Sequence, residues 1–395
     1  MTHDTGRPAG TFRMTAKTFF GLEGVLSHEI KALGGSAISA HRRAVSFTGD
    51  TAMLYRANLH LRTAIRILKP ISTFEAADER ALYDGVRRID WSAYLNADHT
   101  LAVDAALASD IFRHSKYVAL KTKDAIVDQF RDRIGRRPSV DVDHPSVRIN
   151  VYIYNTSVTV AIDSSGESLH KRGWRTALAD AQLNEILAAG LVLISGWDGR
   201  GTLFDPLCGS GTILIEAALM AGHIAPGLFR QNFGFMTWRD FDRRLFSALC
   251  EEAKSMVSRP SCRIIGSDVL DRAVDAARRN IKSAGLQEVI ELTRAKFEDL
   301  PAPDARGILI TNPPYGERIG ADDLKQLYRS LGGMLKHVYA GWEAWVLIAK
   351  NEMAQHIGLR PSRKFEVFNG DIECRFQQFK MYRGSREKAP GNESR

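Results

Sequence analysis

Cysteine is scarce in this 395-residue chain, and none of its four cysteines forms a CxxC pair. This argues against a disulfide framework, a cysteine-based zinc site and an iron–sulfur site, and it fits a reducing compartment. Apolar runs approaching the ~20 residues of a membrane helix are also missing, as is the apolar centre of a signal peptide in residues 1–13. We therefore expect a cytoplasmic protein with no membrane partner and no metal.

The central glycine-rich turn lacks one glycine of the dinucleotide-binding pattern. Residues 202–221 read TLFDPLCGSGTILIEAALMA, which predicts a strand, a turn at Gly209 and Gly211, and a helix from residue 212. A dinucleotide-binding turn would place its third glycine at Leu214, beneath a pyrophosphate. A ligand without a pyrophosphate, such as S-adenosylmethionine, needs only the turn, with Asp205 available to its ammonium group.

A second motif, TNPPYG at residues 311–316, directly follows the apolar run at 307–310. Its two prolines fix φ and stiffen the loop, so the Asn312 amide oxygen and the Pro313 carbonyl can form paired acceptors beside the ring of Tyr315. Such acceptors suit an exocyclic amino group on a flat base, because they can turn the nitrogen lone pair toward an electrophilic methyl group.

Together the two motifs resemble the class I S-adenosylmethionine-dependent amino-methyltransferases, whose NPPY loop receives the base. The resemblance implies S-adenosylmethionine as the cofactor, a Rossmann-like domain with a seven-stranded sheet over residues 183–383, and catalytic roles for Asn312, Pro313 and Tyr315. The alternation of strands and helices independently favours an α/β fold with a parallel doubly wound sheet. Two closing strands without an intervening helix favour an antiparallel edge.

The resemblance also implies a set of cofactor contacts. Asp268 ends the strand at 263–268, where an acid can accept hydrogen bonds from two ribose hydroxyls. Phe297 is expected to flank the adenine, although Lys296 stands where relatives often carry an aspartate. The expected cofactor-binding residues are Asp205, Leu207, Cys208, Gly209, Gly211, Thr212, Asp268, Phe297 and Asn184.

The first half of the chain is expected to bind RNA. A formal net charge of +8 favours a polyanionic partner. The segments KTKDAIVD at 121–128 and DSSGESLHKRGWR at 163–175 resemble the THUMP RNA-binding domain and the junction that follows it. We therefore expect a ferredoxin-like α+β unit at 13–73, a THUMP domain at 74–165 and a linker at 166–182, with a disordered leader at 1–12 and tail at 384–395.

Basic residues on the helix expected at 115–134, and beyond it, are the candidate RNA contacts. Acidic residues interrupt the basic ones, so a solvated helix face is the alternative explanation. The hinge sequence HKRGWR at 170–175 adds positive charge and an aromatic ring at a domain boundary, where a plain basic linker is the alternative. The candidate RNA contacts are Lys121, Lys123, Arg136, Arg137, Lys171, Arg172 and Arg175.

An aromatic-rich insertion at residues 222–260 separates the first two sheet repeats. We expect its rings to pack against the methyltransferase sheet edge, with base stacking as the alternative. Its IAPG at 224–227 and WRDFD at 238–242 resemble the RlmL-type 23S rRNA guanine-N2 methyltransferases, which implies that activity here.

Two other functions remain open at this point. One is a tRNA guanine-N2 methyltransferase of the same architecture, and the other is a catalytically inactive RNA-binding assembly factor, which Lys296 suggests. A DNA adenine-N6 enzyme shares the NPPY motif but needs a domain that reads the major groove. A THUMP-like domain does not supply that reading.

Overall fold

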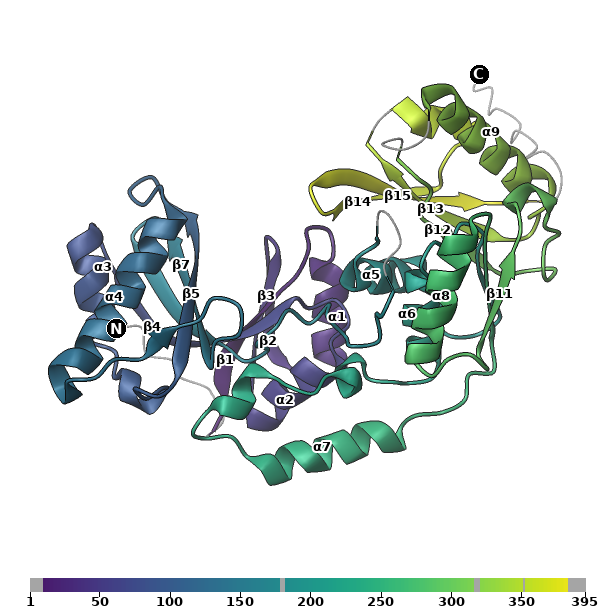
Figure 1. Cartoon of the computed structure of the whole chain (residues 1–395). Coiled ribbons are helices and arrows are strands. Elements are labelled where there is room, and N and C mark those ends of the chain that lie inside the picture. Colours follow the sequence, from purple (N-terminus) through teal and green to yellow (C-terminus); the bar gives the residue numbers. More distant parts are fainter. Residues whose placement is uncertain (1–9, 178–181, 316–319, 351, 383–395) are drawn as a thin grey trace, which may run out of the picture. The chain divides into compact units, whose positions relative to one another are not determined.

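The computed structural model describes residues 10–177, 182–315, 320–350 and 352–382 (Figure 1). Residues 1–9, 178–181 and 384–395, which belong to the expected leader, linker and tail, lie outside the described residues. The chain divides into two compact units. The first unit takes in Met1–Phe19, Glu23–Arg172 and Ala225–Ser255, and the second takes in Phe20–Leu22, Gly173–Ile224 and Met256–Arg395.

One eight-stranded sheet carries the first unit, with the strand order β2-β3-β1-β4-β8-β7-β5-β6. Adjacent strands of this sheet run antiparallel, except that β5 pairs in parallel with both β7 and β6. The strands are β1 (Phe12–Lys17), β2 (Ser36–His41), β3 (Ala44–Gly49), β4 (Arg66–Glu75), β5 (Thr100–Ala108), β6 (Ser139–Val140), β7 (Val147–Tyr154) and β8 (Ser157–Asp163). The helices between them are α1 (Glu23–Ala32), α2 (Thr51–His60), α3 (Glu79–Arg87), the 3₁₀ turn η1 (Trp91–Ala93) and α4 (Ser115–Ile134).

Two hydrophobic cores lie along this sheet. The ferredoxin-like part packs α1 and α2 over β1 and β3, and the THUMP part packs α3 and α4 over β5, β7 and β8. Strand β4 pairs with β1 at its start and with β8 along its length. The domain boundary expected between residues 73 and 74 therefore falls inside a strand that both parts share.

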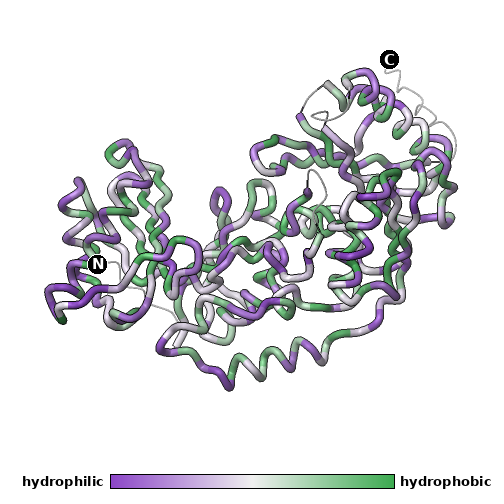
Figure 2. Tube along the Cα trace, viewed as in Figure 1, coloured by the Kyte–Doolittle hydropathy of each residue, from purple (hydrophilic) through white to green (hydrophobic). Residues whose placement is uncertain are grey.

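The aromatic insertion does not pack where the sequence analysis placed it. Its elements η2 (Pro226–Phe229), η3 (Gly234–Thr237) and α7 (Arg243–Ser255) belong to the first unit. The ring centroid of Phe235 lies 4.5 Å from that of Tyr55 on α2 and 5.1 Å from that of Phe246. Hydrophobic and hydrophilic stretches alternate along α7 (Figure 2), as expected for a helix with one buried face. Packing on the methyltransferase sheet edge was therefore wrong, because α2 offers these rings an apolar surface to cover.

The second unit is a seven-stranded sheet with the order β11-β10-β9-β12-β13-β15-β14. Figure 1 shows α9 on one side of this sheet and α5, α6 and α8 on the other. The strands are β9 (Thr202–Asp205), β10 (Arg263–Asp268), β11 (Ile290–Arg294), β12 (Ile308–Thr311), β13 (Glu343–Ala349), β14 (Arg363–Asn369) and β15 (Ile372–Lys380). The helices are α5 (Glu185–Ser195), α6 (Thr212–Ala221), α8 (Asp271–Ser283), η4 (Phe297–Asp299), α9 (Ala321–His337) and η5 (Glu352–Ile357).

The predicted fold class is confirmed in this unit. Strands β9 to β13 pair in parallel, and β15 is antiparallel to both β13 and β14.

Among the described residues, no helix combines the length and apolar character needed to cross a bilayer. The same residues contain no cluster of three or more His, Cys, Asp or Glu suited to a metal ion.

The insertion's role in the first core can be tested with Phe235→Ala. Phe235 is fully buried among aromatic neighbours, so its truncation should lower the free energy of unfolding by about 3–5 kcal/mol. Urea unfolding followed by tryptophan fluorescence measures the change. Val142→Ala, at an exposed position of the same unit, should stay within about 0.5 kcal/mol. Similar small changes in both variants would show that the insertion is not part of this core.

Candidate active site

The two motifs lie side by side at one edge of the second sheet. Strands β9 and β12 are parallel neighbours, with Leu203 paired to Ile308 and Phe204 to Leu309. Just beyond this pairing, the Thr311 hydroxyl donates a 2.8 Å hydrogen bond to Oδ1 of Asp205. The ends of both strands are thus tied together, and Asn312 follows directly after this bond. This edge is where open α/β sheets bind their ligands.

The glycine turn is shaped by the next strand, β10. Asp268 at the end of β10 accepts a 3.0 Å hydrogen bond from the Gly209 amide through Oδ2 and a 2.9 Å bond from the Leu270 amide through Oδ1. A carboxylate has about four lone-pair sites, so each oxygen keeps one for a further donor. Gly209 and Gly211 both have positive φ, and no atom of the described residues lies within 4 Å of a Cβ built at Gly209. The turn therefore leaves room for a ligand against its backbone.

Leu214 replaces the third glycine of a dinucleotide site, and β10 compensates for its bulk. A Cβ built at Gly266 would lie 2.2 Å from the Leu214 Cδ1 atom. The glycine that permits close packing between helix α6 and the sheet is therefore Gly266 on β10, and not a residue of the helix.

Asp205 is a buried acid with one oxygen in use. Its Oδ1 accepts the Thr311 hydroxyl and the Leu207 amide, and Oδ2 receives no hydrogen bond from the described residues. Burial, and secondarily the nearby charge of Asp268, raises the pKa of Asp205 to about 7, although its two hydrogen bonds oppose the shift. An ammonium group beside Oδ2 would favour the charged form.

The NPPY loop holds its amide in a defined orientation. The Tyr315 hydroxyl donates a 2.5 Å hydrogen bond to Oδ1 of Asn312, and Asn369 donates to Tyr315 at 3.4 Å. Burial raises the pKa of Tyr315, so its hydroxyl stays protonated as the donor. The amide oxygen has two lone pairs, which leaves one for an incoming amine. On α9, Tyr328 donates to the Pro314 carbonyl at 3.4 Å and supports the loop from below.

Several expected cofactor contacts have structural roles in this conformation. Asn184 is the N-cap of α5 and accepts from the Ile186 amide at 2.9 Å. Phe297 is 4% exposed and packs in the core under α9, and its contact with the adenine stays a prediction. Burial raises the pKa of the Cys208 thiol and keeps it neutral. Leu207 is half-buried beside the turn.

Two expected RNA contacts are bonded inside the protein: Arg172 is buried, and Arg175 is half-buried. Arg172 is 2% exposed and donates to the Leu169 and Arg62 carbonyls. Arg175 forms a 2.6 Å ion pair with the buried Glu185. The prediction of Arg172 as an RNA contact was therefore wrong, because a charge buried with its hydrogen-bond partners is unavailable to phosphate. Arg175 is held by Glu185, and its contact with RNA stays a prediction.

Arg175 organises the helix starts that border the glycine turn. Its guanidinium lies 3.3 Å from the Ser210 hydroxyl and 3.1 Å from the Thr212 hydroxyl, both at the N-terminal end of α6. Asn280 on α8 adds a further support, donating to the Ser210 carbonyl at 3.2 Å. Thr311 and Asn280 were not among the site residues predicted from the sequence. Two signals in the sequence could have identified them. Thr311 is a polar residue at the end of a buried strand, and Asn280 is a polar residue among the apolar positions of a helix.

The other basic candidates remain accessible. Lys121 lies 5.3 Å from the Tyr83 ring centroid, and Lys123 pairs with Asp124. Arg136, Arg137 and Lys171 are exposed, with Arg136 paired to Asp98 and Lys171 paired to Glu167. Their role in binding RNA stays a prediction.

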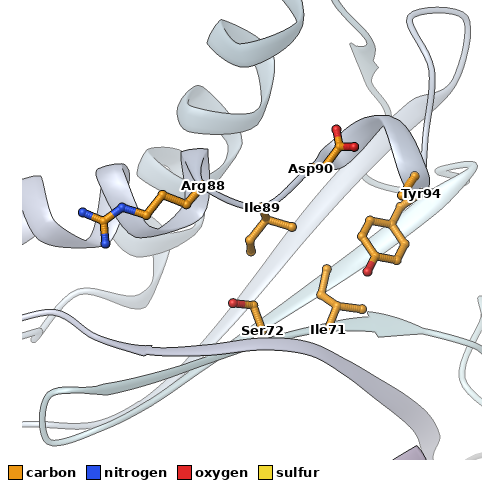
Figure 3. Close-up of a pocket in the computed structure, with 7 residues that line it drawn as sticks. Ile71, Ser72, Arg88, Ile89, Asp90 and Tyr94 are labelled. Atoms are coloured by element: carbon orange, nitrogen blue, oxygen red, sulfur yellow. The ribbon is translucent and has the colours of Figure 1, made fainter. Parts of the chain in front are cut away.

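A cavity of about 260 Å³ lies in the first unit between β4 and the segment from α3 to η1 (Figure 3). Figure 3 shows the Arg88 guanidinium pointing away from the other lining side chains. Asp90 pairs with Arg133 and caps η1, so it is not free for a ligand. Since few polar groups converge on this cavity, it is a poor candidate for a cofactor site.

The fold and the site define a class I methyltransferase domain, linked in one chain to a THUMP domain. The chain belongs to the RMKL-like methyltransferase family: residues 172–378 match its methyltransferase domain. Residues 76–163 match the THUMP domain, and residues 13–68 match the RlmL ferredoxin-like domain. The resemblance identified from the sequence motifs is thereby confirmed.

Among the similar proteins, one is about twice as long as the aligned region and another is of nearly the same length. "Ribosomal RNA large subunit methyltransferase K/L" of Syntrophotalea carbinolica is 42% identical over 372 residues, which cover 91% of this chain but only 52% of that protein. The chain thus spans about half the length of this relative. "Putative RNA methyltransferase slr0064" of Synechocystis sp. is 38% identical, with 94% of this chain and 98% of that protein covered.

A solved structure also covers nearly the whole chain. It is the crystal structure of "SMU.472, a putative methyltransferase complexed with SAH", which is 30% identical and superposes with a TM-score of 0.85. The match covers 96% of this chain and 100% of that one.

The raised pKa of Asp205 predicts a pH-dependent affinity for the cofactor. Below about pH 7 the carboxyl gains a proton and loses its attraction for an ammonium group. The affinity for S-adenosylhomocysteine should therefore fall about 10- to 30-fold between about pH 7.5 and pH 5.5, as measured by calorimetry. Asp205→Asn should bind weakly at both pH values with no such dependence. An unchanged pH dependence in that variant would contradict the assignment.

The ion pair of Arg175 predicts a loss of stability when it is broken. Arg175→Met should cost about 3–5 kcal/mol of unfolding free energy, because Glu185 would remain buried without its counter-charge. Adding Glu185→Met should recover much of this loss. Lys171→Met, at an exposed ion pair, is the matched control and should change stability by less than about 1 kcal/mol. Full stability of Arg175→Met in urea unfolding would contradict the buried role.

Proposed function

We propose that the chain is an S-adenosylmethionine-dependent RNA methyltransferase that methylates the exocyclic N2 amine of a guanine in 23S rRNA. S-adenosylmethionine is the cofactor. The bond between Thr311 and Asp205 carries this proposal most directly, because it fixes the NPPY loop beside the glycine turn. The family to which the chain belongs supports methyl transfer, and the large-subunit K/L relatives support ribosomal RNA as the substrate.

Each residue of the turn has a part in holding the cofactor. Asp268 keeps a lone pair on each oxygen for ribose hydroxyls, and Asp205 offers Oδ2 to the ammonium group. The backbone at Gly209 and Gly211 allows close approach, and Leu207, Cys208 and Thr212 complete the wall. When bound, the cofactor supplies an electrophilic methyl group on a sulfonium.

The NPPY loop orients the amine. Oδ1 of Asn312 and the Pro313 carbonyl accept its two N–H bonds, which leaves the nitrogen lone pair directed at the methyl group. Tyr315 acts first as a positioning residue through its bond to Asn312, and its ring is the surface on which the base rests. A base inside a folded RNA must be turned out of its stack to reach this site.

Positioning accounts for more of the rate than proton transfer does. Alignment of two reactants can supply about 7–11 kcal/mol, whereas general-base assistance supplies roughly 3–5 kcal/mol. A neutral amide is suited to this task, because the amine becomes acidic only after it is methylated and can then release its proton to water.

RNA binding is assigned to the first unit. Its THUMP domain carries Lys121, Lys123, Arg136 and Arg137, with Lys171 after the last strand. These cations contact phosphates and so position the RNA without reading its sequence.

Product analysis tests the proposed function. Purified chain is incubated with S-adenosylmethionine and either ribosomal RNA or tRNA from cells that lack the gene, and the RNA is digested for nucleoside mass spectrometry. We expect N2-methylguanosine in 23S rRNA. Methylation of tRNA alone would favour the tRNA enzyme, and N6-methyladenosine would overturn the choice of base. Binding of RNA without any methylation would favour an inactive assembly factor.

Asn312→Ala should lower turnover on the order of 10²-fold or more, because the amine loses one of its two orienting acceptors. The affinity for RNA should stay nearly unchanged, since phosphate contacts lie elsewhere. Single-turnover methylation and filter binding measure the two quantities. Gln326→Ala, which removes an exposed amide from α9, is the control. An equal loss of RNA affinity in Asn312→Ala would reject the role of Asn312 in catalysis.

A further inference from the structure

Strand β7 presents two tyrosines on a sheet face that no helix of the THUMP part covers. Ile149, Val151 and Ile153 point into the core beneath α3 and α4, which Figure 1 shows on one side of these strands. The alternate residues face the other way, and Tyr152 and Tyr154 are 39% and 58% exposed. Two large aromatic side chains are therefore held at the surface by the two-residue period of a strand.

Small side chains surround both rings. On β5, Ala106 lies opposite Tyr152 and Ala108 lies opposite Tyr154, and both alanines are exposed. On the other flank, β8 places Thr159 beside Tyr152 and Ser157 beside Tyr154. Because none of these neighbours is bulky, the flat faces of the tyrosines are accessible to another planar group.

An uncompensated cation lies at one end of this face. The Lys17 ammonium on β1 is 5.8 Å from the Tyr152 ring centroid, and it makes no ion pair with any described carboxylate. Burial, and next the charge of Arg43, lowers the pKa of Lys17. A half-buried lysine with a cationic neighbour is a site that an anion would stabilise.

The nearby acids are already neutralised or lie at the opposite end. Asp163 pairs with Arg66, and Asp104 on β5 pairs with Arg148 at 3.0 Å. Glu75 on β4 lies across Ser157, on the side of Tyr154. The positive charge therefore gathers at the Tyr152 end, where a phosphate would be accepted.

We infer that this face binds single-stranded RNA, with two successive unpaired bases stacked on Tyr152 and Tyr154 and a backbone phosphate on Lys17. Side chains two residues apart on a strand are about 6.6 Å apart, so each base would rest on its own ring. Aromatic stacking together with a cation is how proteins hold unpaired nucleic acid. The inference rests on the proposed function, since the bound strand is part of the same RNA substrate, and it adds a site separate from the basic residues of α4.

Affinity for a short single-stranded RNA tests this site. Tyr152→Ala and Tyr154→Ala should each weaken binding about 5- to 150-fold, the range expected for one stacked base, in filter binding with the full chain. Tyr152→Phe should keep the affinity within a few-fold, and Tyr152→Leu should not. Lys17→Ala should reduce the slope of log affinity against log salt by about 1. Tyr382→Ala, at an exposed tyrosine of the second unit, is the matched control.

The stacking site and the proposed function can be disproved separately. A far-UV circular dichroism spectrum and a urea unfolding curve equal to those of the parent would show that the tyrosine variants are folded, including the first unit that carries both tyrosines. If these folded variants bind single-stranded RNA as tightly as the parent while the parent methylates RNA, the stacking site is overturned and the proposed function stands. If the parent binds no RNA, both are overturned. A loss of duplex affinity equal to the loss for single strands would also overturn stacking, because paired bases cannot open onto the rings.

Discussion

The buried hydrogen bond between Thr311 and Asp205 is the constraint on which the site depends. Strand β9 ends in an acid and a glycine turn, and β12 ends in a rigid loop of two prolines; neither feature alone defines a reaction. Since both groups are buried at 0% and 1% exposure, breaking the bond would leave polar atoms unsatisfied in a low-dielectric interior. The bond therefore fixes how the cofactor turn and the amine-binding loop meet.

The strand ends and their motifs could be predicted because their signals are local. A short apolar run followed by an acid, glycines or paired prolines specifies both an element and where it stops, so β9, β10 and β12 end where the sequence indicated. The parallel sheet with its antiparallel edge was likewise predictable from the alternation of elements, and the family resemblance added the expectation of seven strands.

Burial of particular side chains was not predictable in the same way. Arg172 and Arg175 look like surface charges in a basic segment, yet their partners, such as the Arg62 carbonyl and Glu185, come from other elements. The aromatic rings of the insertion pack against the apolar face of α2, which is far from the insertion in sequence. Leu214 could not be understood until Gly266 was seen packed against it. In each case the deciding contact joins different elements of the fold, and the periodicity within one element carries no information about it.

A crystal structure of the chain with S-adenosylhomocysteine and a guanine nucleotide would test the central claim most directly. The account predicts ribose hydroxyls on Asp268, the ammonium on Asp205, and the sulfur facing the base amine held by Asn312, with nothing between them. A sulfur directed away from Asn312, or a protein side chain filling the space between the turn and the loop, would contradict it.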